Sequence, residues 1–310
     1  MYVFLKKSLL VLFIAFIVTF VTPSNSIACG CGCNIFSVGN KWMMATSPGM
    51  KFSLQYNYMD QNKNWNGASL APADSNEDKD VRTNFYTLGL QYMATREWGV
   101  IIEAPVWTRF FSTVDDDGLS ASTQHSSFGD MRVTGIYSGL SEDMSTSILL
   151  GIKLPTGSIT QSLFDRDTQI GTGTTDFLFG GYQMGQELSW GWYAHALWQH
   201  ALNTKDGYRP GDSFDVNIGF HYDDVVQIIP IIPIIPIIQI IGSYHGSDSG
   251  IQSHPDETGY QRLFIAPGFE LQLNRTVQLN ADFRIPIVTN VTGNQLIAPI
   301  LVNASVNISL

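Results

Sequence analysis

The stretch SFDVNIGFHYD, Ser213 to Asp223, alternates apolar and polar residues along its whole length. Successive side chains of a β-strand point to opposite faces, so this alternation gives the strand one apolar and one polar face. The same period of two recurs in MKFSLQYNYMD (50–60), in TVQLNADFRIPI (276–287) and from Val302 to Ile308. Beyond the apolar run near the N-terminus no segment has sustained helical periodicity, so the pattern predicts an all-β fold.

Soluble β-sandwiches and membrane barrels both use strands with one apolar face, so strand length and connections must separate them. The candidate strands are about 10 residues long, which is the length that a tilted strand needs to cross a bilayer. In chain order they cover 49–59, 82–93, 98–110, 128–139, 145–155, 174–184, 190–202, 213–223, 236–246, 260–272, 276–287 and 297–310.

The connections between these strands alternate between long and short. Long polar connections cover 60–81, 111–127, 156–173, 203–212, 247–259 and 288–296, and short ones cover 94–97, 140–144, 185–189 and 273–275. Outer-membrane barrels of bacteria have long loops outside and tight turns in the periplasm. Aromatic residues near strand ends fit the girdles at the membrane interfaces, among them Trp98, Trp107, Trp190, Tyr222 and Tyr260. The sequence therefore predicts a transmembrane antiparallel up-and-down β-barrel of about 12 strands over 49–310.

The N-terminal residues resemble an export signal. Two lysines precede an apolar run from Leu9 to Val21, and the small residues Ser26 and Ala28 stand at −3 and −1 of a cut before Cys29. This order predicts a cleaved signal peptide over 1–28 and a location in the bacterial outer membrane. The apolar run is short for a transmembrane helix. A lipoprotein signal with Cys29 lipidated is the alternative, although Ser26 stands where such signals usually have Leu.

All three cysteines lie in CGCGC, in a segment over 29–48 that we expect to form a Cys-rich periplasmic leader. Cys29, Cys31 and Cys33 are candidate ligands for a soft metal ion such as Cu(I) or Zn(II), because Gly-spaced thiolates two residues apart can share one ion. An oxidised pair with a free thiol is the alternative in an oxidising compartment. No other cofactor is expected.

The stretch IIPIIPIIPIIQIIG, Ile228 to Gly242, is apolar enough for a membrane span but has prolines at 230, 233 and 236. A spanning helix excludes such a run, because each proline lacks an N–H and clashes with the preceding turn. Prolines in the middle of a barrel wall would remove hydrogen bonds to both neighbouring strands. We therefore expect 226–235 to project from a periplasmic turn and the wall to begin near Pro236.

The polar faces of the candidate strands carry charges of both signs, which argues against a strongly ion-selective ring. Such residues form either an internal network that fills a narrow lumen or the lining of a constricted pore, and the two readings are compatible. The candidate lumen-lining residues are Lys51, Glu103, Asp130, Arg132, Lys153, Asp176, Asp215, His221, Arg262, Glu270, Asp282 and Arg284.

The middle of the chain resembles a known family. The segments SSFGDMRVTGIYSGL (126–140), ILLGIKLPTGSI (148–159) and IGTGTTDFLFGGYQMGQ (170–186) are similar to outer-membrane proteins labelled "MetA-pathway of phenol degradation". The shared elements are Gly129-Asp130, Lys153 to Gly157, and Gly171 to Asp176. The resemblance implies a transport barrel of about twelve strands that passes small, often aromatic, compounds. The CGCGC segment, the Ile-Ile-Pro repeat and the C-terminal Leu310 depart from the family pattern.

These features predict a passive outer-membrane channel for small solutes, hydrophobic or aromatic ones included. A non-conducting barrel that binds, handles metal or scaffolds through CGCGC is the alternative. The expected partners are outer-membrane lipid and lipopolysaccharide, small solutes and, on the inner side, a periplasmic protein. A net charge of −10 without clustered Lys and Arg excludes nucleic acid. No enzyme activity is expected, because His125 beside Ser126 and Ser127 is a common chance pairing.

Overall fold

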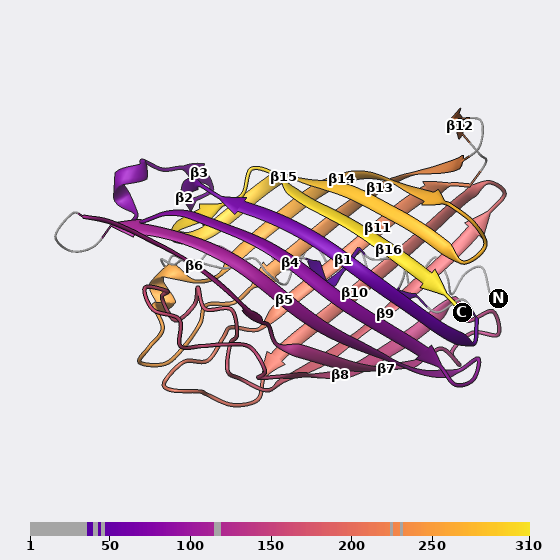
Figure 1. Ribbon diagram of the computed structural model, residues 1–310, viewed down its shortest axis with the longest axis horizontal. Helices are drawn as coiled ribbons and strands as arrows, with labels where there is room; N and C mark the ends of the chain where they lie inside the picture. Colours follow the sequence, from indigo (N-terminus) through magenta and orange to yellow (C-terminus); the bar gives the residue numbers. More distant parts are fainter. Residues whose placement is uncertain (1–35, 40–42, 45–46, 115–118, 224–225, 230–231) are drawn as a thin grey trace, which may run out of the picture.

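Alternating side chains shape one antiparallel sheet whose first and last long strands pair with each other (Figure 1). The computed structural model describes residues 36–39, 43–44, 47–114, 119–223, 226–229 and 232–310. Each long strand pairs with the next along the chain, and β1 closes the sheet against β16 from Lys51↔Ser309 to Met59↔Leu301. The described chain is thus a closed, twelve-stranded antiparallel barrel, as the sequence predicts.

Every predicted strand overlaps a strand of the wall. The wall strands are β1 (Gly49–Gln61), β4 (Asp78–Met93), β5 (Trp98–Val114), β7 (Met131–Tyr137), β8 (Thr146–Leu154), β9 (Asp176–Glu187), β10 (Trp190–Ala201), β11 (Ser213–Tyr222), β13 (Ile232–His245), β14 (Tyr260–Gln272), β15 (Val277–Ile297) and β16 (Leu301–Ser309). The predicted signal peptide over 1–28 lies outside the described residues.

Short elements extend the wall at the end with the long loops (Figure 1). They are β2 (Lys63–Gly67), β3 (Ser69–Leu70), β6 (Ser120–Phe128) and the 3-10 turns η3 (Ala73–Ser75) and η4 (Pro255–Glu257). Strand β5 pairs with β7 over its first half and with β6 over its second half. The change of partner falls at Gly129 and Asp130, the two residues that separate strand β6 from strand β7.

The Ile-Ile-Pro repeat lies at the opposite rim. Strand β12 (Val226–Ile229) pairs only with the start of β13, at Val226↔Ile234 and Ile229↔Ile232, and stands beyond the barrel in Figure 1. Strand β13 joins β14 from Ile234 and β11 from Ile237. The sequence places the start of the wall near Pro236, and pairing with β14 begins two residues earlier, at Ile234. The projecting part is a short β-hairpin.

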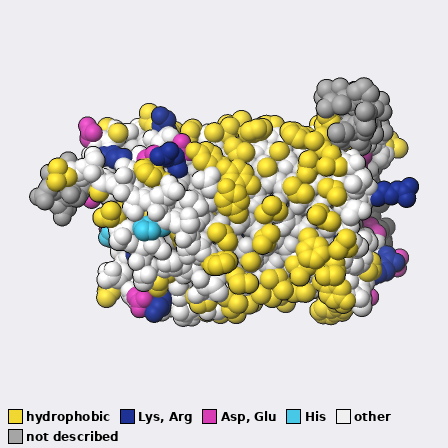
Figure 2. Space-filling view, viewed as in Figure 1, with side chains coloured by type: hydrophobic (Ala, Val, Ile, Leu, Met, Phe, Trp, Pro, Cys, Tyr) yellow, Lys and Arg dark blue, Asp and Glu magenta, His cyan; other side chains and the backbone are white. Residues whose placement is uncertain are grey.

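The two faces of the wall differ in chemistry. In β1, Phe52 and Leu54 are exposed on the outer face, whereas Ser53 and Gln55 are buried on the inner face. Figure 2 shows a broad band of apolar side chains across the visible face of the barrel, with charged side chains gathered towards its two ends. This is the surface that a bilayer-spanning barrel requires. In the described part of the chain no helix is long and apolar enough to span a membrane.

Candidate functional site

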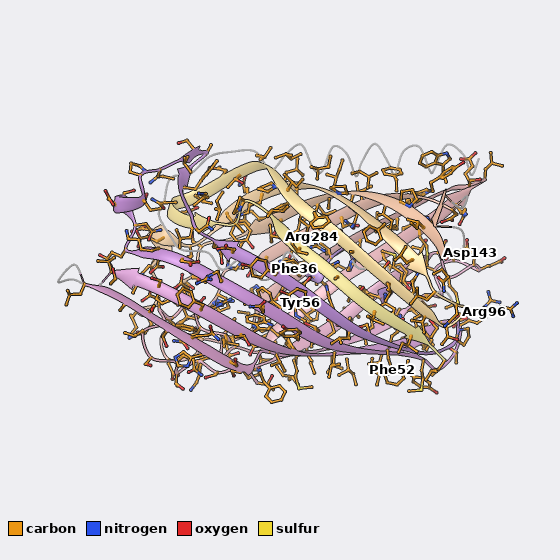
Figure 3. The ribbon with its side chains drawn as sticks, turned by 45° about the horizontal axis from the view of Figure 1, so that its top comes forward. Phe36, Phe52, Tyr56, Arg96, Asp143 and Arg284 are labelled. Atoms are coloured by element: carbon orange, nitrogen blue, oxygen red, sulfur yellow. The ribbon has the colours of Figure 1, made fainter. Side chains whose placement is uncertain are left out.

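The described residues 36–39 and 43–44, named the N-terminal segment below, lie inside the barrel. Phe36 and Val38 are buried in one apolar cluster with residues from widely separated wall strands, including Phe85 of β4 and Phe264 of β14. Figure 3 places Phe36 in the middle of the barrel, close to Arg284. These described residues, which belong to the expected periplasmic leader over 29–48, lie in the lumen. The physical reason is that apolar side chains such as Met59 interrupt the polar inner face and are removed from water by this segment.

Hydrogen bonds from wall side chains hold this segment at two levels along the barrel axis. Near the middle, the Arg132 guanidinium donates a hydrogen bond to the Ser37 hydroxyl. Nearer the short-turn end, Lys51 Nζ donates to the Met44 carbonyl at 3.1 Å and Gln91 Nε2 donates to the Met43 carbonyl at 2.9 Å. The segment is therefore held by wall residues from several strands and narrows the lumen.

Gly39 has the left-handed backbone conformation, with φ +89°, and it sits against the wall. A Cβ at this position would lie 3.0 Å from Gln239 Oε1 and 3.2 Å from Arg284 Nη2. Glycine adopts positive φ without steric cost and leaves room for these side chains. The backbone conformation at position 39 consequently depends on glycine.

The three motifs of the family resemblance meet at the Asp130 carboxylate. Asp130 Oδ1 accepts the Gly157 N–H at 2.9 Å, and Oδ2 accepts both the N–H and the hydroxyl of Thr172, at 2.9 and 2.8 Å. Lys153 Nζ lies 3.3 Å from Asp130 and 2.7 Å from Asp176. Such charge-assisted bonds are the stronger class of hydrogen bond. Gly129-Asp130, Lys153 to Gly157 and Gly171 to Asp176 therefore form one junction between wall and loop.

The loop between β8 and β9 folds inward over this junction. Arg109, which is fully buried, donates from Nε to Thr83 Oγ1 at 2.9 Å and from Nη1 to the carbonyls of Thr168 and Gln169. Phe164 of the loop packs on Phe111 of β5, with ring centres 5.5 Å apart. The lumen is thus covered from the long-loop side by residues of this loop.

A cavity of about 140 Å³ remains between the N-terminal segment and the inward loop. Phe36, Phe85 and Trp107 form part of its lining, and charged and amide side chains form another part. The Phe85 and Trp107 rings meet edge to face at 4.8 Å. An engineered cavity of about 150 Å³ in another protein holds one benzene, so this space suits one ring-sized molecule. The cavity is the candidate functional site.

The predicted lumen-lining residues lie on inner-facing positions of the wall strands, apart from Asp130, which lies between β6 and β7. Glu103, Asp130, Arg132 and Lys153 line the cavity itself. The other members lie along the inner wall, where Lys51 contacts the N-terminal segment and the rest are buried: Asp176, Asp215, His221, Arg262, Glu270, Asp282 and Arg284.

Most of these charges belong to local networks. Asp282 Oδ1 lies 3.0 Å from Arg284 Nε, and Asp215 accepts a hydrogen bond from the Ser243 hydroxyl at 2.5 Å. The His221 ring lies 2.7 Å from the Asp223 carboxylate. Groups of opposite sign thus pair locally inside the lumen, where both signs were expected from the sequence.

Two aromatic residues expected in the interfacial girdles face the lumen instead. Trp107 lines the cavity and Tyr260 is 3 % exposed on the inner face. Trp107 is four residues from Glu103 and Tyr260 is two residues from Arg262 on the same strand. Residues an even number apart point to the same face of a strand, so the alternation predicts that both rings face inward. Trp98 and Trp190 are exposed at the short-turn end and pair with Tyr137 and Tyr222, as a girdle requires.

Other sequence candidates are not brought together. His125 contacts the Thr123 hydroxyl at 3.1 Å, whereas Ser126 pairs with Thr108 and Ser127 with the Phe128 carbonyl. Cys29, Cys31 and Cys33 lie outside the described residues. Among the residues that are described, no three His, Cys, Asp or Glu side chains are grouped as metal ligands.

Several functional-site residues were not among the sequence candidates. Arg109 and Gln199 face the lumen on strands that were correctly predicted, and their parity could have identified them. Phe36 and Ser37 had no such signal, because the sequence around them has no strand period. Thr172 contacts Asp130 through a loop whose path local sequence does not encode.

No protein-family model matches the sequence, and no curated protein matches it either. The chain is similar in structure to an outer membrane channel from Pseudomonas putida F1, with a TM-score of 0.66, 13% identity, and coverage of 88% of this chain and 100% of that chain. The Pseudomonas putida toluene transporter TodX (TM-score 0.45, 10% identity, 92% and 95% covered) and the beta domain of the Bordetella autotransporter BrkA (0.46, 8%, 85% and 100%) are more distant. The chain therefore has the fold of an outer-membrane β-barrel.

Proposed function

We propose that the protein is a passive outer-membrane channel for small solutes, including hydrophobic and aromatic ones. The observation that carries the proposal is the ring-sized cavity inside a closed barrel whose outer surface bears an apolar belt. An apolar belt suits lipid, whereas a polar, mixed-charge inner wall suits solutes that move through water. In this proposal the outer face contacts membrane lipid and lipopolysaccharide, and the short-turn rim faces the periplasm and any partner there.

The N-terminal segment and the inward loop make the proposed channel narrow. Phe36 and Val38 fill the centre of the lumen, and the remaining cavity holds one small molecule at a time. A channel of this kind passes single small solutes slowly and excludes large ones. The junction at Asp130 supports kinship with the barrels labelled "MetA-pathway of phenol degradation", because the three motifs behind the resemblance act together in one structural unit.

A second candidate is a non-conducting barrel whose working part is the N-terminal CGCGC segment. The filled lumen favours it, because a barrel closed by its own chain needs no pore. In this candidate Cys29, Cys31 and Cys33 hold a soft metal ion. Metal content of the purified protein tests it: stoichiometric Cu or Zn that disappears in the triple Cys→Ser variant supports it, and equal metal content in both proteins rejects it. Neither candidate gives the chain a catalytic role.

Liposome swelling tests the channel proposal. Vesicles that contain the folded protein should swell in solutions of single-ring solutes and should swell more slowly in solutions of disaccharides. Empty vesicles set the background for lipid-soluble compounds. A heat-dependent shift in gel migration verifies the fold of each sample. Swelling rates equal to those of empty vesicles, with correctly folded protein, reject the channel and leave the non-conducting barrel.

A further inference from the structure

The cationic side chains that line the cavity are already occupied by protein groups. Lys153 Nζ contacts three acceptors, namely the Thr172 hydroxyl and the carboxylates of Asp130 and Asp176. An ammonium group has three N–H donors, so Lys153 has none left for a solute. Arg132 donates to the Ser37 hydroxyl and to Gln199 Oε1, the latter at 3.1 Å. The cavity therefore offers a bound molecule little positive hydrogen-bonding capacity.

The carboxylates that line the cavity differ in whether they accept hydrogen bonds from other protein groups. Asp248 accepts the Tyr208 hydroxyl at 2.7 Å and the Gly211 N–H at 2.8 Å, and Asp130 is bound as described above. Glu103 and Asp167 also line the cavity, yet neither has an ion pair or a hydrogen bond from another side chain among the residues that the structure describes. Arg132 stands opposite Glu103 in the β5–β7 pairing and its charge acts on the Glu103 carboxylate, while its guanidinium donates hydrogen bonds to Ser37 and Gln199.

The aromatic part of the lining complements these two carboxylates. The Phe36 and Phe85 rings lie 5.4 Å apart, and Trp107 meets Phe85 edge to face. Aromatic rings attract organic cations through their electron-rich faces and shield apolar groups from water. The wall already uses such contacts, since Arg284 lies over Phe36 and Arg109 over Trp107. A ring-sized space whose lining combines aromatic rings with two carboxylates that accept no side-chain hydrogen bond from the described residues suits one chemical class.

We propose that this cavity binds a small organic cation, an ammonium ion attached to a single ring or a short apolar chain. The ammonium group would donate hydrogen bonds to Glu103 and Asp167, and the apolar part would contact Phe85 and Trp107. This inference rests on the proposed function, because it assigns a solute class to the same cavity. With these two carboxylates in the cavity, the channel would be selective for cationic over anionic molecules of equal size.

Calorimetric titration of the full-length protein in detergent micelles tests the inference with three probes of matched size: benzylamine, benzyl alcohol and benzoate. Benzylamine should bind roughly tenfold tighter than benzyl alcohol, and benzoate should bind most weakly. Glu103→Gln and Asp167→Asn should each weaken benzylamine binding several-fold and leave benzyl alcohol unchanged. Glu97→Gln, in an exposed turn at the opposite end of the barrel, is the control and should bind all three probes like the unaltered protein.

The other outcomes overturn the inference. Equal or tighter binding of benzyl alcohol would identify a site for neutral rings, and tightest binding of benzoate would mean that Arg132 or Lys153 exchanges its protein partners for the solute. Unchanged benzylamine affinity in both variants would place the amine elsewhere. Binding in micelles does not require transport, so specific benzylamine binding without vesicle swelling would reject the channel and keep the site.

Discussion

The guanidinium carbon of Arg284 lies 5.1 Å from the centre of the Phe36 ring (Figure 3). Arg284 belongs to β15 of the wall and Phe36 to the N-terminal segment, so this contact fastens the segment to the inside of the barrel. Arg284 is fully buried and also pairs with Asp282 at 3.0 Å. A desolvated cation over a ring is a comparatively strong contact of its class. The position of the segment, and with it the width of the lumen, depends on Phe36.

Replacing Phe36 should therefore widen the channel. Phe36→Ala removes a buried ring and should weaken docking of the segment by about 3 kcal/mol, while the wall itself stays folded. We expect a higher rate of vesicle swelling and larger single-channel conductance. Phe52→Ala is the matched control, because the Phe52 side chain is exposed on the outer face and points away from the lumen (Figure 3). Equal conductance of the Phe36→Ala variant and the unaltered protein would show that this segment does not limit passage.

The junction at Asp130 should be a main determinant of stability. Asp130→Ala leaves Lys153 with one fewer counter-charge and leaves the N–H groups of Gly157 and Thr172 without their acceptor. Breaking such a buried network costs roughly 3–5 kcal/mol. The temperature at which the folded gel band disappears should fall clearly. Asp74→Ala, on an exposed turn, should leave that temperature unchanged, and a similar small effect of both substitutions would refute the structural role of the junction.

Removing part of the Ile-Ile-Pro repeat should leave the barrel intact. Deletion of residues 228–233 shortens the projecting hairpin but keeps Ile234, where pairing with β14 begins. The variant should retain heat-dependent gel migration and unaltered conductance. Deletion of 237–239 is the contrasting case, because those residues pair with both β11 and β14. A shortened hairpin that prevents barrel formation would place the repeat within the wall.

Binding of benzylamine should weaken in acid. Burial and the nearby carboxylates of Asp248, Asp165 and Asp78 raise the pKa of Asp167 well above its usual value. A group with a raised pKa takes up its proton as the pH falls through that pKa, and protonated Asp167 no longer attracts a cation. Benzylamine affinity should drop as the pH falls through the raised pKa of Asp167, and Asp167→Asn should flatten this part of the profile. An identical pH profile in the variant would exclude Asp167 from the response.

The raised pKa of Asp167 also makes the stability of the protein depend on pH, and this dependence has the opposite direction to that of benzylamine binding. Because the folded-state pKa of Asp167 is raised, its contribution to stability is fully present below its unfolded pKa and is lost as the pH rises through the folded value. Without a cation, the inward loop should therefore dock more firmly in acid. Protection of the loop backbone in hydrogen exchange should increase on acidification, after correction for the intrinsic rate, and Asp167→Asn should abolish the increase.

The barrel could be predicted from sequence because its determinants are local. Alternation in segments such as 213–223 fixes strands, faces and register together, and connection lengths fix the topology. The same parity placed charged residues such as Asp215 and Arg284 on the inner face. It also assigns Trp107 and Tyr260 to that face, although both lie near strand ends, where interfacial aromatic residues are expected.

The filled lumen could not be predicted in this way. Phe36 and Ser37 lie in a segment without periodicity, so local rules give it no place. A faint signal existed in the wall, since Met59 and Phe85 are apolar at positions in phase with polar inner-face residues. The Asp130 junction was also hidden, because Gly157 and Thr172 reach the carboxylate through loop backbone, and such contacts form only in the tertiary structure.

Planar-bilayer recording of the purified, folded protein tests the central claim most directly. The account predicts discrete channel events of small conductance, which become larger in Phe36→Ala and stay the same in Phe52→Ala. The gel-shift assay on the same sample establishes that the barrel is folded. Absence of channel events in folded protein, in both the unaltered chain and the Phe36→Ala variant, would contradict the claim that this barrel is a channel.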